Sequence, residues 1–225
     1  MNKLLSILSL LIVYMTSTVT AQTHYKAQIS VGAHGGVNAS MVNFSPSVRQ
    51  GFLLGANGGL NFRYTEENHF GFLVEANFEQ RGWSENFENE PFSYSRTIDY
   101  IQIPFMSHIY FGRRHKFFIN LGPSISFKLG DSVKSNFDYE NVGSVPNFPV
   151  HTSQQYSYPT KGKVDYGISG GLGGEFGINT RNSIYLEARF YFGIGNVLPS
   201  GRTDHFGASN PMTLSVSAGY WFRVK

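Results

Sequence analysis

The sequence contains no cysteine. Disulfide bonds, thiolate catalysis and cysteine-ligated metal sites are therefore excluded, as is a lipid anchor on an N-terminal cysteine. The histidines show no spacing typical of a metal site, and they stand at His24, His34, His69, His108, His115, His151 and His205. We expect no metal ion and no cofactor.

The chain is also poor in charge and in long apolar runs. Charged residues make up 15% of the sequence, well below the roughly 25% of a soluble domain. Beyond the N-terminal segment, no stretch approaches the ~20 apolar residues that a membrane helix needs. The basic residues are scattered, so no nucleic-acid-binding surface is predicted. An ordinary soluble domain and a helical membrane protein are both disfavoured.

The N-terminal segment has the features of a secretory signal peptide. Lys3 supplies a positive start, Leu4 to Met15 form an apolar run, and Val19 and Ala21 fit a cleavage site. The run is too short to span a bilayer. We therefore predict a signal peptide over residues 1–21 and one domain over 22–225.

Strict alternation of apolar and polar residues dominates the mature chain. From Val164 to Ile178, apolar side chains such as Tyr166 and Ile168 alternate with small or polar ones such as Ser169. Successive side chains of a strand point to opposite faces, so this period of two predicts strands. Eight such segments are expected, at about 25–38, 50–64, 69–83, 97–111, 116–130, 164–178, 183–195 and 212–224.

The connections between these segments alternate between short and long. Those at 65–68, 112–115 and 179–182 are short, and those at 39–49, 84–96, 131–162 and 196–211 are long. Outer-membrane barrels have short periplasmic turns and longer external loops. The pattern predicts an eight-stranded, antiparallel, up-and-down transmembrane β-barrel, with both termini in the periplasm.

Alternation alone leaves open which face points inward, since a soluble lipocalin-like barrel would hide its apolar face. The polar face here consists mostly of Gly, Ser and Asn, which suit a crowded narrow lumen. The other face carries Phe, Ile, Leu and Val almost without interruption, as contact with lipid requires. Aromatic residues near the turn ends, such as Tyr64, Phe117 and Phe222, fit an interfacial girdle. We therefore expect outer-membrane lipid around the barrel.

Several short motifs resemble those of a known family. They are Gly35-Gly36-Val37-Asn38, Ile101-Gln102-Ile103-Pro104-Phe105, Gly122-Pro123, Glu187-Ala188-Arg189-Phe190 and Ser217-Ala218-Gly219-Tyr220-Trp221-Phe222. With them the chain resembles the porin-family outer-membrane β-barrel domain of Bacteroidota, of the PorT-like type. The resemblance implies an outer-membrane location, folding by the barrel-assembly machinery, and a weak link to protein secretion. Phe222 would serve as the terminal aromatic from slightly inside the end.

The polar face places charged residues in the expected lumen. They are His34, Arg63, Glu75, Glu79, Arg81, His108, Lys128, Asp165, Glu175, Glu187 and Arg189. Unpaired charges in a poorly hydrated lumen are costly, so opposite signs should pair. We predict a network of Glu75, Glu187 and Arg189 near mid-barrel, with Glu175 or the histidines. It either plugs the barrel or lines a narrow, gated pore.

Enzymatic function is not expected. The glycines from Gly170 to Gly177 lack the Lys-Ser/Thr of a phosphate-binding loop, and no helix follows them. Some eight-stranded outer-membrane barrels modify lipid A with Ser, His and Asp or Glu. Candidates of those types stand in the loops at Asp131, His151, Asp204 and His205. Polar loop residues are usually just solvated, so catalysis is only the third hypothesis.

The longest loop, about 131–162, offers a recognition surface. Its aromatic residues stand among Asn, Ser, Pro and Gln and are Phe137, Tyr139, Phe148, Tyr156 and Tyr158. Tyrosine among small polar residues makes adaptable contact area, while a self-packed external cap is the alternative. The sequence thus predicts a structural or narrow-pore barrel, with loop-based binding of a protein or glycan, or a secretion-accessory role, as the second hypothesis.

Overall fold

The computed structural model describes residues 27–87, 90–149 and 153–225. The predicted signal peptide, Tyr25 and His151 lie outside the described residues. Eight long strands form one antiparallel sheet, and they are β1 (Gln28–Ser45), β3 (Leu53–Glu67), β4 (Phe70–Glu85), β5 (Tyr94–Gly112), β6 (His115–Ser135), β7 (Val164–Gly177), β8 (Asn182–Gly193) and β9 (Ala208–Arg223). Within the described ranges no helix has the length and apolarity to cross a membrane.

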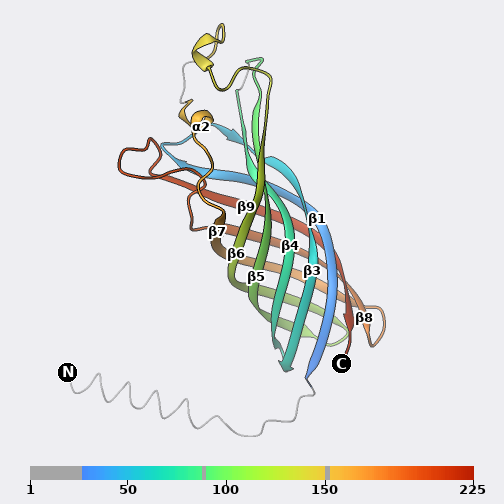
Figure 1. Cartoon of the computed structure of the whole chain (residues 1–225). Coiled ribbons are helices and arrows are strands. Elements are labelled where there is room, and N and C mark those ends of the chain that lie inside the picture. The colour runs from blue at the N-terminus through green and yellow to red at the C-terminus, as the bar shows by residue number, and fades with distance from the viewer. Residues whose placement is uncertain (1–26, 88–89, 150–152) are drawn as a thin grey trace, which may run out of the picture.

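The sheet closes on itself. Each long strand pairs with its neighbour in chain order, and β1 pairs with β9, with Val31 opposite Phe222. A short strand, β2 (Gln50–Gly51), adds to the end of β4. The predicted fold class, an all-β ring of eight antiparallel strands, is confirmed. Figure 1 shows the ring, with the C-terminus at the end of the short turns.

Side chains alternate between the two faces as the sequence predicts. Leu60 is 70% exposed on the outer face, while the next residue, Asn61, is 4% exposed in the lumen. The outer face carries large apolar side chains on every long strand, as Val37, Phe78 and Phe190 illustrate. This belt gives the barrel an apolar surface where a soluble protein would be polar.

The strands reach further toward the long loops than the sequence predicts. β1 continues to Ser45, β5 begins at Tyr94, and β6 continues to Ser135, past the predicted loop start at Asp131. The polar residues there still pair, with Tyr94 opposite Ser135. The predicted boundaries at 39, 96 and 131 were wrong because ladder hydrogen bonds continue where the apolar outer face ends.

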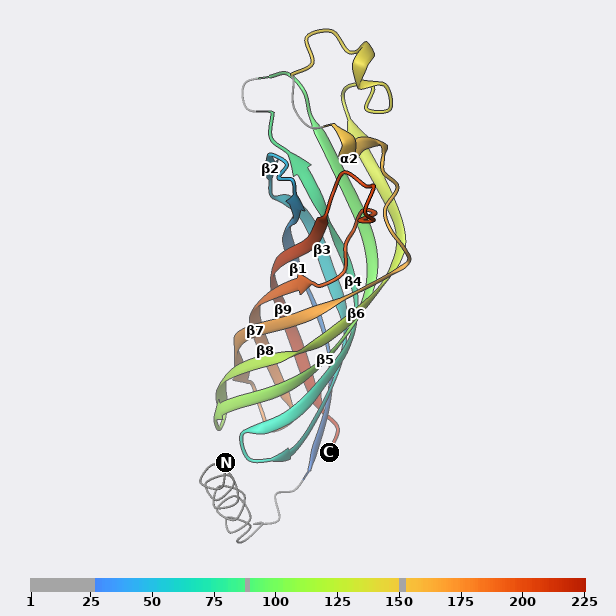
Figure 2. The same ribbon diagram turned by 90° about the vertical axis from the view of Figure 1, so that its left-hand side faces the viewer.

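These extensions carry a second, apolar core above the ring. The β6–β7 loop includes η1 (Val142–Ser144) and α2 (Gln154–Ser157) and lies at the top of Figures 1 and 2. Its aromatic residues pack with Phe44, Trp83, Tyr94 and Phe206 from the strand ends and the last loop. We call this folded assembly at the loop end the cap.

The outer face generates a first prediction, about lipid contact. Leu172 lies in the middle of the belt, opposite Ala188, and Ile178 lies just past the end of β7. They are 56% and 54% exposed, so each loses similar protein contacts on substitution. Leu172→Arg should cost about 2–4 kcal/mol and Ile178→Arg about 0–1 kcal/mol, because the cost of a charge depends on depth in the bilayer. Urea unfolding in lipid vesicles measures both, and equal costs would contradict a lipid-facing belt.

Candidate functional site

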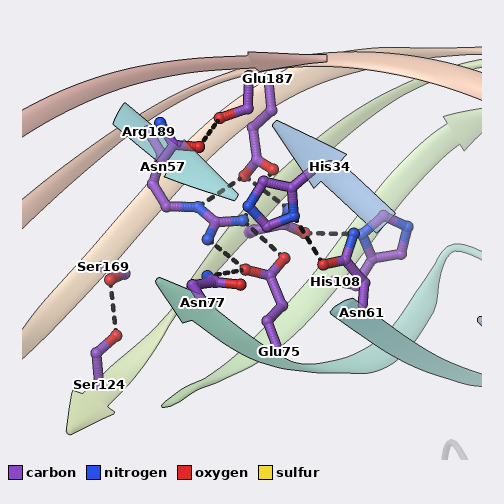
Figure 3. A network of polar contacts seen from close by, with 12 residues as sticks. His34, Asn57, Asn61, Glu75, Asn77, His108, Ser124, Ser169, Glu187 and Arg189 are labelled. Carbon is purple, nitrogen blue, oxygen red and sulfur yellow. Dashed lines mark hydrogen bonds and ion pairs between the residues drawn. The ribbon is translucent and has the colours of Figure 1, made fainter. Parts of the chain in front are cut away.

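Arg189 lies at the centre of the lumen and binds two carboxylates. Its Nη1 and Nη2 donate to the two carboxylate oxygens of Glu75 at 2.5 and 2.9 Å. Its Nε and Nη2 donate to Glu187 at 3.2 and 2.9 Å. Figure 3 shows the guanidinium between both acids. β4 and β8, which carry Glu75 and Arg189, lie four strands apart in the ring of eight, so this ion pair spans the lumen.

Amide and imidazole side chains extend this network. Asn77 Nδ2 donates to Glu75 at 2.8 Å, and Asn120 Nδ2 donates to Glu187 at 2.9 Å. His108 Nδ1 lies 2.7 Å from Asn120 Oδ1. All five side chains are buried. The donors satisfy carboxylate oxygens that a dry lumen would otherwise leave without partners, which makes the buried charges tolerable.

A second ion pair spans the lumen closer to the short turns. Arg63 of β3 donates from Nη1 to Glu175 of β7 at 2.6 Å, again across four strands. Ser183 Oγ donates to the same carboxylate at 2.7 Å, and the Arg63 guanidinium lies over the Trp221 ring at 4.4 Å.

The sequence left open whether Glu175 or the histidines join the Arg189 network. The structure places Glu175 in this second ion pair. Arg63 Nη1 lies 3.4 Å from His108 Nε2, so His108 and Asn120 link the pair to the network.

A third charged group lies toward the cap. Arg81 Nη2 donates to Ser126 at 2.8 Å, and its Nε lies 3.3 Å from Glu79. Asp165 lies 3.7 Å from Arg81 Nη1 and accepts the Tyr191 hydroxyl at 2.8 Å. The guanidinium is held between two rings, those of Tyr100 and Tyr191.

Around the second ion pair, apolar and aromatic side chains fill the lumen. Their cluster, which we call the aromatic plug, consists of Leu73, Met106, Tyr110, Phe118, Tyr185 and Trp221. Two glycines make room for it: a Cβ at Gly173 would lie 2.5 Å from the Phe118 ring, and one at Gly219 2.4 Å from the Tyr185 ring. The glycine run of β7 therefore serves close packing.

Little space remains in this lumen. Among the described residues, the cavity beside His34 and Arg189 holds about 10 Å³, and the one beside Phe118 and Trp221 about 0 Å³. A single water molecule needs about 10–15 Å³. These two cavities therefore hold at most an isolated water and are too small for a hydrated ion.

Two predicted lumen residues lie at the edges of these groups. His34 is half-buried, with Nδ1 2.8 Å from Asn61 Oδ1. Lys128 is half-buried near the cap and donates to Thr160 at 2.5 Å. The hydrogen bonds of these two residues go to Asn61 and Thr160 and not to Arg189. The predicted acids and arginines lie closer together than these two residues do to them.

The predicted recognition residues of the long loop pack inward. Phe137 and Phe148 have ring centroids 5.0 Å apart, and Tyr156 lies 5.7 Å from Phe137 and 4.6 Å from Tyr94. Tyr156 is 5% exposed. Tyr139 and Tyr158 are half-buried against the same core. Their role in recognition stays a prediction, and their packing indicates that they build the cap.

The cap also contains a buried carboxylate that sequence reasoning missed. Glu85 accepts the Tyr156 hydroxyl at 2.5 Å and Gln155 Nε2 at 2.7 Å. Burial raises the pKa of Glu85 to about 7, although both hydrogen bonds favour its charged form. Glu85 shares the inward parity of Glu75 and Glu79, and that continued alternation was the signal that could have found it.

Comparisons with known proteins agree with this geometry. A family model described as "Outer membrane protein beta-barrel domain" matches residues 20–198. The crystal structure of Neisserial surface protein A (NspA) is similar, with a TM-score of 0.51, 13% identity, and coverage of 88% of this chain and 99% of that one. The crystal structure of the outer membrane protein OprG from Pseudomonas aeruginosa is also similar, with a TM-score of 0.53 and 11% identity. The match covers 89% of this chain and 96% of that one. These identities show a shared fold alone, and no curated protein sequence matches the chain.

The central ion pair predicts that Arg189→Met strongly lowers the stability of the barrel. The substitution leaves Glu75 and Glu187 buried without their cation, which should cost about 3–5 kcal/mol of unfolding free energy in urea. The charge-free variant Glu75→Gln/Glu187→Gln/Arg189→Met should recover most of the loss. Arg202→Met, at an exposed loop position, is the control. If Arg189→Met changed the unfolding free energy no more than Arg202→Met, the network would not stabilise the barrel.

Glu85 predicts a pH dependence of the cap. Its pKa is raised in the folded state, so its contribution to stability is complete below about pH 4.5 and is lost as pH rises through about 7. The change amounts to about 3 kcal/mol. Hydrogen exchange of cap amides should show easier opening at pH 8 than at pH 5. Glu85→Gln should remove that difference, and an unchanged difference would assign it to another group.

Proposed function

The chain belongs to the outer membrane protein β-barrel domain family, and on that premise we propose that it is a closed, non-enzymatic barrel of the outer membrane. Its cap faces the cell exterior, and its short turns and both termini face the periplasm. The observation that carries the proposal is the filled lumen, where the cavities beside Arg189 and Trp221 hold about 10 and 0 Å³. This favours the structural role over the narrow pore.

The PorT-like assignment within the porin family is a finer part of the proposal. It rests on short motifs such as Ile101–Phe105 and Glu187–Phe190. The second of these includes two members of the lumen network, Glu187 and Arg189. The motif therefore supports a lumen closed in the same way as in the PorT-like family. It says less about a substrate shared with that family.

A second candidate function is binding at the cap. Loops that only cover a barrel need no core of their own, whereas here Trp83, Leu198 and Phe206 are completely buried. Arg96 fixes the base of the long loop by donating to Asp131 at 2.7 Å and to the Tyr158 carbonyl at 2.8 Å. A pre-ordered surface loses less entropy on binding. It supports recognition of a protein or glycan outside the cell.

The absence of enzymatic activity remains a proposal, and the partners of the loop carboxylates support it. Asp131 is engaged by Arg96 and Thr160, and Asp204 accepts the Gly201 backbone N–H at 2.6 Å. These contacts support structural roles for both acids. Mass spectrometry of lipid A from cells with and without the protein tests the point, and a modification that depends on the protein would overturn it.

Ion conductance in a planar bilayer tests the closed barrel. The wild-type protein, shown to be folded by its heat-modifiable gel mobility, should give no discrete current steps. Phe118→Ala/Trp221→Ala removes two rings of the aromatic plug and should introduce steps, which shows that the assay detects an open lumen. Reproducible wild-type steps whose ion selectivity changes in Glu187→Gln would establish a pore instead.

A further inference from the structure

A hollow lies at the short-turn end of the barrel, away from the cap. Its volume is about 510 Å³, within the range of ordinary small-ligand sites. Trp221 belongs both to the aromatic plug and to the lining of this hollow, and we call the lumen side of the lining its floor. We call this hollow the vestibule.

Basic side chains dominate the vestibule. Among the residues that the structure describes, its lining holds one carboxylate, that of Glu175, and six basic groups: Arg63, Arg113, Arg114, Lys116, Arg181 and Arg223. Glu175 is already engaged by Arg63 at 2.6 Å, and Lys116 Nζ lies 4.0 Å from it. The remaining four charges are therefore not neutralised by the vestibule's own residues.

The outer arginines come from three separate segments. Arg113 and Arg114 form the β5–β6 turn, Arg181 lies in the β7–β8 turn, and Arg223 ends β9. Among the described residues, Arg113, Arg181 and Arg223 have no carboxylate within 4.0 Å. Like charges repel, so a hollow lined by these groups favours an anion as its occupant.

Backbone contacts hold these segments in place. The Arg223 N–H donates to the Arg181 carbonyl at 2.7 Å, and the Gly177 N–H donates to the Arg114 carbonyl at 3.0 Å. The Arg114 guanidinium donates to the carbonyls of Gly177 and Ile178, both at 3.2 Å. The backbone around the vestibule is thus held in place, which lowers the entropy cost of binding a ligand there.

We propose that the vestibule binds a phosphate-bearing anion. Guanidinium groups pair with phosphate oxygens in a planar, bidentate geometry, and clusters of arginine serve this recognition in proteins. The apolar belt ends beside the vestibule, since Phe117 follows Lys116 and Phe222 precedes Arg223 on the outer face. The phosphate therefore comes either from a phospholipid headgroup at this rim or from a free solute. The proposal is independent of whether the lumen conducts.

Binding is measured on the whole folded barrel in maltoside detergent, which contains no phosphate. The Trp83→Phe background leaves Trp221, in the vestibule floor, as the single tryptophan reporter. Sodium phosphate is titrated at an ionic strength of about 0.15 M, held constant with sodium chloride so that screening does not change. A saturable change in Trp221 fluorescence is expected with phosphate, and a weaker one with citrate at equal charge.

Matched variants assign the effect to the vestibule. Arg113→Ser/Arg181→Ser/Arg223→Ser should weaken phosphate binding at least tenfold, and Arg181→Ser alone should weaken it by a smaller factor. The control Lys134→Ser/Lys163→Ser/Arg202→Ser removes three exposed charges at the loop end and should change nothing. Gel mobility verifies that each variant is folded.

A second arm identifies the source of the phosphate. Soluble short-chain phosphatidylglycerol that competes with phosphate at lower concentration supports a headgroup site, whereas binding of phosphate alone supports a free solute. Absence of saturable binding in both arms would overturn the proposal. The proposal would also be overturned if citrate bound as tightly as phosphate, or if the two triple variants lost phosphate affinity equally.

Discussion

The structure depends on the need to neutralise charge inside a narrow, dry tube. Arg189 meets Glu75 from the opposite wall, and Arg63 meets Glu175 in the same way. Each pair joins strands four apart in a ring of eight, so the lumen is only as wide as two facing side chains. Since an unpaired charge in such a place is costly, these pairs favour the register that brings each arginine level with its acid.

This constraint divides the molecule along its axis. The apolar side chains that would form the core of a soluble protein face outward, so within the ring the core is polar apart from the aromatic plug. Above the ring, apolar side chains face inward, and the cap buries Trp83 and Phe206 as a soluble domain does. Below it, the vestibule leaves basic groups without acids. The cap thus contains an apolar core, the vestibule is lined by basic groups, and the packed lumen lies between them.

Much of the fold could be predicted from the sequence, because alternation reports the face of each strand directly. It placed Glu75, Glu187 and Arg189 in the lumen. It also predicted that they pair, but not which atoms meet, because the contact of Arg189 with Glu75, 114 positions away, depends on the register of strands that alternation leaves free. The partner of Glu175 was missed for the same reason.

The two ends of the barrel were harder to predict for different reasons. The loop aromatics such as Phe137 and Phe148 were interpreted as a contact surface, since a sequence does not show that strand extensions rise to pack against them. Arg113, Arg181 and Arg223 look scattered along the chain. Only closure of the ring brings the two turns and the end of β9 to one hollow.

The most direct test of the central claim is the hydrogen exchange of the Arg189 guanidinium, followed by ¹⁵N NMR of the protein in a lipid bilayer. A guanidinium held between Glu75 and Glu187 should show resolved Nη protons that exchange slowly with solvent. The exposed Arg202 provides the fast-exchanging reference in the same spectrum. If Arg189 exchanged as fast as Arg202, the lumen would be open to water and the closed barrel would be contradicted.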